Sequence, residues 1–92
     1  MQKICIRAQI NGKVQGVCYR DSTCRKAKEL HLTGWVKNLP SGEVELLACG
    51  DLNTITLFIE WLWQGPPAAK VDHVQWVEVE WQSLKDFTII WN

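Results

Sequence analysis

One stretch of the chain combines two glycines and an arginine in a spacing that suits anion binding. Residues 12–20 read Gly-Lys-Val-Gln-Gly-Val-Cys-Tyr-Arg, and we expect them to form a loop between a strand and a helix. A glycine-containing loop at this place can turn several backbone N–H groups toward one point, with the helix dipole behind them. Arg20 adds a permanently charged, planar group that matches phosphate oxygens. The stretch predicts a phosphate cradle, although a tight turn with a surface arginine would show the same pattern.

Neither a nucleotide-binding loop nor a metal site is indicated. The stretch lacks the Gly-Lys-Ser/Thr ending of a P-loop, so a nucleotide is not implied. The cysteines and histidines, none of them paired at metal-ligand spacing, are Cys5, Cys18, Cys24, Cys49, His31 and His73. Paired ligands at short spacing mark structural zinc sites. We therefore expect no metal.

Composition excludes several classes of protein. Ten Lys and Arg residues against ten Asp and Glu residues give a net charge of zero, whereas nucleic-acid and anionic-membrane binders carry basic surfaces. No apolar run approaches the roughly 20 residues of a spanning helix. The first seven residues alternate, unlike the apolar block of a signal peptide. We expect one cytoplasmic domain over residues 1–92, without nucleic-acid or membrane partners.

Hydrophobic periodicity outlines the elements that position the loop. Strands are predicted over residues 3–10, 34–38, 43–49, 70–81 and 85–91, and helices over residues 22–32 and 52–64. Asp21 or Ser22 is the expected N-cap of the first helix, and Gly34 its expected end. The order is typical of an α+β, ferredoxin-like (βαββαβ) sandwich, an antiparallel sheet with two helices on one face and a short extra C-terminal strand.

This topology makes two cysteines neighbours. Right-handed crossovers place the third strand between the first and second, antiparallel to both. Cys5 and Cys49 are then expected side by side on the face opposite the apolar alternation. The geometry invites a disulfide and a reducing cytosol opposes it, so both redox states stay open.

The loop at residues 12–20 also resembles the signature of the acylphosphatase family. A second stretch, Gly-Trp-Val-Lys-Asn at 34–38 followed by Gly-Glu-Val at 42–44, is similar to the second signature of that family. Further matches are Gly50, Trp61-Leu62, Gly65-Pro66 and Phe87. The resemblance covers nearly the whole chain and implies the same ferredoxin-like fold.

The resemblance implies hydrolysis of the carboxyl–phosphate bond of small acyl phosphates by a monomer that needs no cofactor. Arg20 corresponds to the phosphate-binding arginine of the family, and Asn38 to its water-orienting asparagine. The backbone N–H groups expected to hold phosphate are those of Gln15, Gly16, Val17, Cys18, Tyr19 and Arg20. Strands one and two are parallel, so the loop and Asn38 are expected at the same end of the sheet.

Each assignment has an alternative. Asn38 could simply open a hairpin turn, and Gln15 could brace the loop. Asp21 could repel substrate, pair with Arg20 or cap the helix. Cys18, within the cradle, could be sensitive to oxidation. A non-catalytic phosphate- or anion-binding domain of the same fold is the alternative function, and the sequence does not name the physiological acyl phosphate.

Overall fold

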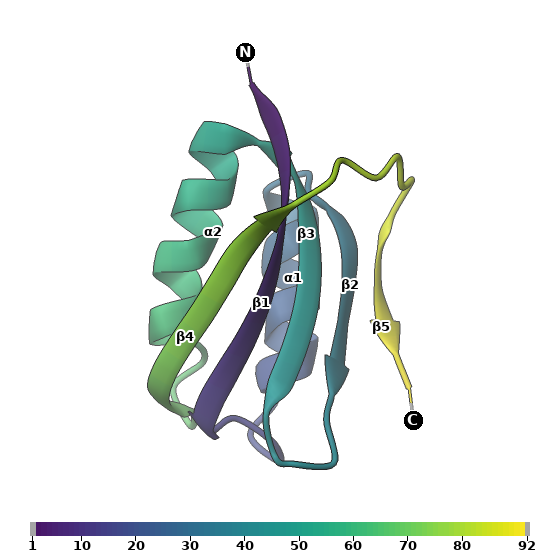
Figure 1. The fold of residues 1–92 in the computed structure, drawn as a ribbon. Coiled ribbons are helices and arrows are strands. Elements are labelled where there is room, and N and C mark those ends of the chain that lie inside the picture. Colours follow the sequence, from purple (N-terminus) through teal and green to yellow (C-terminus); the bar gives the residue numbers. More distant parts are fainter. Residues whose placement is uncertain (1, 92) are drawn as a thin grey trace.

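Five strands form one sheet, and both helices cover the same face of it (Figure 1). The structure, a computed structural model, describes residues 2–91. The elements in chain order are β1 (Lys3–Lys13), α1 (Tyr19–Glu29), β2 (Thr33–Asn38), β3 (Val44–Asp51), α2 (Leu52–Gln64), β4 (Lys70–Val79) and β5 (Phe87–Ile90). The strand order is β4-β1-β3-β2-β5. The predicted βαββαβ order and the central place of the third strand are confirmed.

Alternation along the strands places one set of side chains under the helices. The main members of this core are Ile4, Ile6, Ala8 and Ile10 from β1, Val44, Leu46 and Ala48 from β3, and Ile55, Phe58 and Leu62 from α2. The strand residues recur at every second position and the helix residues at three- and four-residue steps, as each element requires. Removing this apolar surface from water is the main force that holds the layers together.

The sheet is mixed, and not purely antiparallel as predicted, because β5 runs parallel to β2. Gly34 of β2 lies between Phe87 of β5 and Ala48 of β3. Its N–H donates to the carbonyl of Asp86 at 2.9 Å. Its φ is +141°, and a Cβ there would collide with the carbonyl of Leu47. Glycine at this position therefore permits the close approach of the neighbouring backbone.

The first helix begins earlier than predicted. α1 starts at Tyr19, because Cys18 already adopts a left-handed conformation (φ 64°) that turns the loop into the helix. The carbonyl of Cys18 accepts the N–H of Ser22 at 2.9 Å. The N-cap position makes no side-chain hydrogen bond, so the expected capping by Asp21 or Ser22 is wrong.

Other element ends also differ from the predicted ones. α1 ends at Glu29, and His31, with φ 58°, makes the left-handed turn that was predicted for Gly34. β1 continues to Lys13, because residues 12 and 13 pair with β4 beyond a bulge. β4 and β5 are shorter than predicted, at 70–79 and 87–90. The strand ends depend on hydrogen bonds to distant strands, which a local pattern does not contain.

Candidate active site

The loop between β1 and α1 has the backbone shape of an anion-binding nest. Gly16 has φ 75° and Cys18 has φ 64°, and Val17 lies between them outside the left-handed region. Backbone that alternates between the two hands turns successive N–H groups toward one side. A Cβ added to Gly16 would meet no atom within 4 Å, so the loop is open to solvent at Gly16. Cys18 is exposed and its thiol is free.

Apolar side chains anchor this loop from beneath. Val14 is 1% exposed and Val17 is 9% exposed, and both belong to the main core. Gln15, Gly16 and Cys18 alternate with them and are partly or fully exposed. Burial of the two valines therefore presents the intervening backbone to solvent.

Tyr19 ties the start of α1 to the end of α2. It is buried, and its hydroxyl donates to the carbonyl of Leu62 at 2.6 Å. That carbonyl would normally accept the N–H four residues on, but residue 66 is proline and has none. Burial raises the pKa of the Tyr19 phenol, which keeps it a neutral donor. A Cβ at Gly65 would press on the Tyr19 ring.

Gln15 connects the loop to the turn between β2 and β3. Its Nε2 donates to the carbonyls of Leu39 and Glu43, each at 2.8 Å. Both partners are acceptors, so the amide nitrogen must face them. The bracing alternative for Gln15 is confirmed for its side chain. Leu39 directly follows Asn38, so this brace links the two candidate parts of the site.

Arg20 is the second residue of α1 and is partly buried. Its Cζ lies 4.3 Å from the centroid of the Trp91 indole. The adjacent carboxylate of Asp21 pairs with Arg25 at 3.2 Å, one helical turn further on. The expectation that Asp21 could pair with Arg20 is therefore not met. Both Asp21 and Arg25 are exposed, and such pairs contribute only a few tenths of a kcal/mol.

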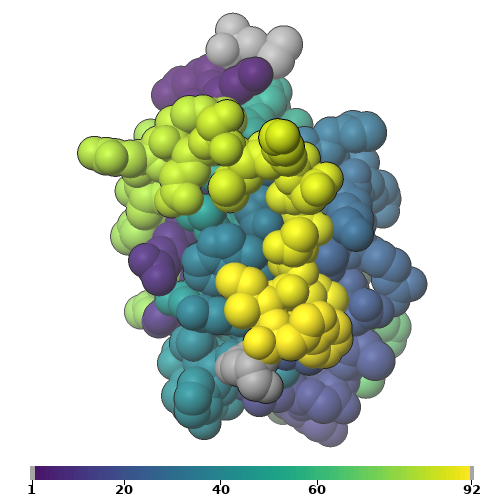
Figure 2. All heavy atoms as spheres, turned by 90° about the vertical axis from the view of Figure 1, so that its right-hand side faces the viewer, coloured from purple at the N-terminus to yellow at the C-terminus, as the bar shows by residue number. Residues whose placement is uncertain are grey.

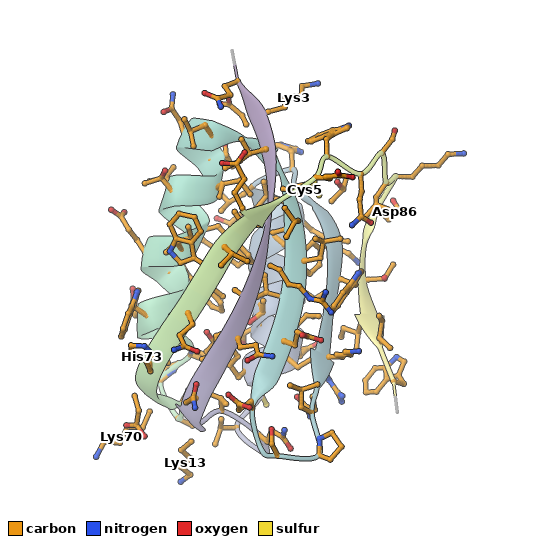
Figure 3. The ribbon with its side chains drawn as sticks, viewed as in Figure 1. Lys3, Cys5, Lys13, Lys70, His73 and Asp86 are labelled. Carbon is orange, nitrogen blue, oxygen red and sulfur yellow. A yellow bond between two sulfur atoms is a disulfide. The ribbon has the colours of Figure 1, made fainter. Side chains whose placement is uncertain are left out.

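Asn38 is the last residue of β2, partly buried and paired with Val44 of β3. β1 and β2 are both antiparallel to β3, so they run in the same direction and end at the same edge. This edge is the lower one in Figure 1, and Figure 3 marks it by Lys13 at the end of β1. The loop, the start of α1 and Asn38 are thus brought to one end of the sheet, as predicted. The contact of Trp91 with Arg20 was not predicted, since no spacing in the sequence connects them.

The cysteine pair lies toward the opposite end of the sheet. Cys5 faces Cys49 in the β1–β3 register, and the structure joins them by a disulfide. Figure 3 shows Cys5 far from Lys13 along β1. The two cysteines and Leu47 form a small buried cluster on the sheet face opposite the helices, and Trp35 and Val79 pack against it. The disulfide therefore contributes to stability at a distance from the candidate site.

Residues 2–91 contain neither a cluster of metal ligands nor a membrane-spanning helix. No three His, Cys, Asp or Glu side chains in this range are grouped so as to hold a metal ion. No helix in the same range is long and apolar enough to cross a membrane.

Known proteins of one family resemble this chain. The model of the family described as acylphosphatase matches residues 6–89. An acylphosphatase of Coxiella burnetii is 53% identical over 85 residues, which are 92% of this chain and 90% of that protein. The solved structure of an acylphosphatase from Coxiella burnetii superposes with a TM-score of 0.93 at 50% identity, covering 96% of this chain and 93% of the other. The Bacillus subtilis acylphosphatase also has a TM-score of 0.93, at 34% identity, covering 96% and 99%.

Proposed function

The chain belongs to the acylphosphatase family and hydrolyses the carboxyl–phosphate bond of acyl phosphates, and from this premise we propose that Arg20 and the loop backbone bind the phosphoryl group while Asn38 orients the attacking water. The alternative of a non-catalytic anion-binding domain is not favoured, because relatives about half identical to this chain are acylphosphatases. The single observation that carries the proposal is the meeting of the nest, Arg20 and the end of β2 at one edge of the sheet.

Charge neutralisation at the phosphate is the first requirement. Phosphoryl transfer spreads negative charge over three equatorial oxygens, and the catalyst must stabilise that charge. The N–H groups of residues 15–20 supply the positive ends of fixed dipoles. The guanidinium of Arg20 supplies one full positive charge. Because they are held before substrate arrives, they need no reorganisation in the transition state. The left-handed conformations at Gly16 and Cys18 support this role.

Placing the nucleophile is the second requirement. Asn38 has no titratable group, so it acts by position: its amide can accept from and donate to one water at the same time. That water attacks phosphorus in line with the acyl oxygen, the P–O bond to the acyl group breaks, and the acyl group leaves as a carboxylate. The proton of the water passes to a phosphate oxygen. A carboxylate is a good leaving group, so orientation supplies much of the remaining rate.

We further propose a cofactor-free monomer in the cytoplasm. The proposed residues all come from one chain, which supports action by a single copy. The thiols of Cys18 and Cys24 are free, which suits a reducing compartment. Cys5 and Cys49 are 0% and 1% exposed, so burial protects their disulfide from soluble thiols.

Hydrolysis of benzoyl phosphate in the presence of a metal chelator tests the reaction. We expect the wild-type protein to turn over with chelator present and Asn38→Ala to lose kcat sharply while its affinity for inorganic phosphate changes little. Asn53→Ala, an exposed asparagine of α2, is the matched control and should behave as wild type. A large loss of phosphate affinity in Asn38→Ala would contradict the water-orienting role.

The phosphate affinity of the Arg20→Ala variant tests the proposed role of Arg20 in binding. A charge-assisted contact is worth roughly 1.5–3 kcal/mol, so the Kd for inorganic phosphate should rise by about one to two orders of magnitude. Rate and affinity should fall together, because the contact serves both substrate and transition state. An unchanged Kd would remove Arg20 from the site.

A further inference from the structure

The candidate phosphate-binding arginine lies over an aromatic ring. The Arg20 guanidinium carbon lies 4.3 Å from the Trp91 ring centroid, well within the range in which a cation is attracted to an indole face. Trp91 itself is 73% exposed. Most of the ring is therefore open to water, and its contact with Arg20 adds a directional attraction to what little apolar surface it buries.

The parallel pairing of β5 delivers Trp91 to the site. The register runs from Gly34 opposite Phe87 to Lys37 opposite Ile90. The pairing ends there, one residue before Asn38 on β2 and one residue before Trp91 on the C-terminal segment. Figure 2 shows the C-terminal segment (yellow) lying along the molecule beside the blue segment that contains α1.

β5 is firmly attached at its other end. Phe87 is 2% exposed and packs edge-on against Phe58, with ring centroids 6.2 Å apart. The thiol of Cys24 in α1 donates to the Phe87 carbonyl at 3.7 Å. The strand thus has a buried anchor in the core and an exposed end at the candidate site.

We propose that Trp91 is a positioning residue for the hydrolysis, holding the Arg20 guanidinium at the mouth of the cradle by stacking on its face. The inference rests on the proposed role of Arg20 in binding phosphate. A guanidinium has five N–H donors in its plane, and an indole ring attracts the cation without neutralising its charge. A carboxylate partner would instead occupy the in-plane donors and compete with phosphate. The nearest carboxylate in sequence, Asp21, is paired with Arg25, so the aromatic contact can restrain Arg20 without neutralising it.

Two substitutions of Trp91 separate the effect of its aromatic ring from the effect of its size. Trp91→Leu removes the aromatic face, and Trp91→Phe keeps one. A cation–π contact at an exposed site corresponds to roughly a 2- to 5-fold change in an equilibrium constant. We expect Trp91→Leu to raise the Kd for inorganic phosphate by about that factor and to lower kcat/KM for benzoyl phosphate at least as much. Trp91→Phe should retain most of both. Trp81→Leu, a half-exposed tryptophan beyond the far end of β4, is the matched control and should change neither.

The side-chain NMR signals of Arg20 test the contact itself, while retention of phosphate affinity in Trp91→Phe but not in Trp91→Leu ties that contact to binding. Protons above an indole face are shifted upfield, so we expect the Arg20 Hε and Hδ signals upfield in the wild type and in Trp91→Phe, and near ordinary positions in Trp91→Leu. Unshifted signals in the wild type, or a Trp91→Leu variant with wild-type phosphate affinity, would overturn the inference. Arg20→Ala keeps the two proposals apart. If it loses phosphate binding while Trp91→Leu does not, only the role of Trp91 fails; if it binds phosphate normally, the proposed function of Arg20 fails first.

Discussion

The Gln15 brace makes a sharp prediction, because both of its partners are carbonyl oxygens. Its Nε2 donates to Leu39 and Glu43 at 2.8 Å each. Replacing Gln15 by alanine removes both N–H donors. Replacing it by glutamate places a carboxylate, which can only accept, against two carbonyl acceptors. We therefore expect Gln15→Glu, the change closer in shape, to be the more damaging of the two.

The size of the destabilisation depends on the hydrogen bonds that each carbonyl keeps after Gln15 is replaced. A neutral hydrogen bond contributes about 0.5–1.5 kcal/mol net, so two of them amount to roughly 1–3 kcal/mol. Leu39 O still accepts the N–H of Gly42, and Glu43 O still accepts the N–H of Leu39. Neither carbonyl is orphaned in Gln15→Ala, which places the loss in the lower part of that range, about 1–2 kcal/mol. For a domain of this size the Tm falls by roughly 4–8 °C per kcal/mol.

Denaturant unfolding and benzoyl phosphate kinetics measure the two consequences. The brace joins the loop to the turn after Asn38, so its loss lets the two parts of the site drift, and displacements near 1 Å can cost up to about a hundredfold in rate. We expect kcat/KM to fall in Gln15→Ala and further in Gln15→Glu. Acidification should partly restore Gln15→Glu, since the protonated acid regains one O–H donor. Equal stability of the two variants at neutral pH would refute the assignment of Nε2 as the donor to both carbonyls.

Three further perturbations probe other contacts. Tyr19→Phe leaves the Leu62 carbonyl without its hydroxyl donor and should lower the free energy of unfolding by about 1–3 kcal/mol in urea; an unchanged midpoint would contradict the contact. Reduction of the Cys5–Cys49 disulfide, which spans a sequence separation of 44, should cost up to about 4 kcal/mol by chain entropy and leave KM unchanged, because the bond lies away from the site. Cys18→Val should destabilise by about 1 kcal/mol or more and Cys18→Gly should not, since the position is left-handed (φ 64°); calorimetry of both variants compares them.

Local patterns in the sequence determined the elements and their order. Alternation at Ile4, Ile6 and Ile10 predicted a half-buried strand, and the spacing of Ile55, Phe58 and Leu62 predicted α2 over 52–64, which the structure confirms. The rules of strand connection then ordered the sheet and placed Cys5 beside Cys49. These predictions succeed because each depends on neighbours in the chain, or on a handedness that every chain shares.

What depended on distant partners was decided only by the tertiary structure. The sequence singled out Gln15, Arg20 and Asn38, but not that the Gln15 side chain bonds the turn after β2. Nor did it show that α1 begins at Tyr19, directly after the left-handed Cys18, where the expected caps play no part. The parallel pairing of β5 with β2 carries Trp91 to Arg20 from the far end of the chain. A contact between residues so far apart leaves no periodicity in the sequence, because it exists only after the intervening sheet has closed around its core.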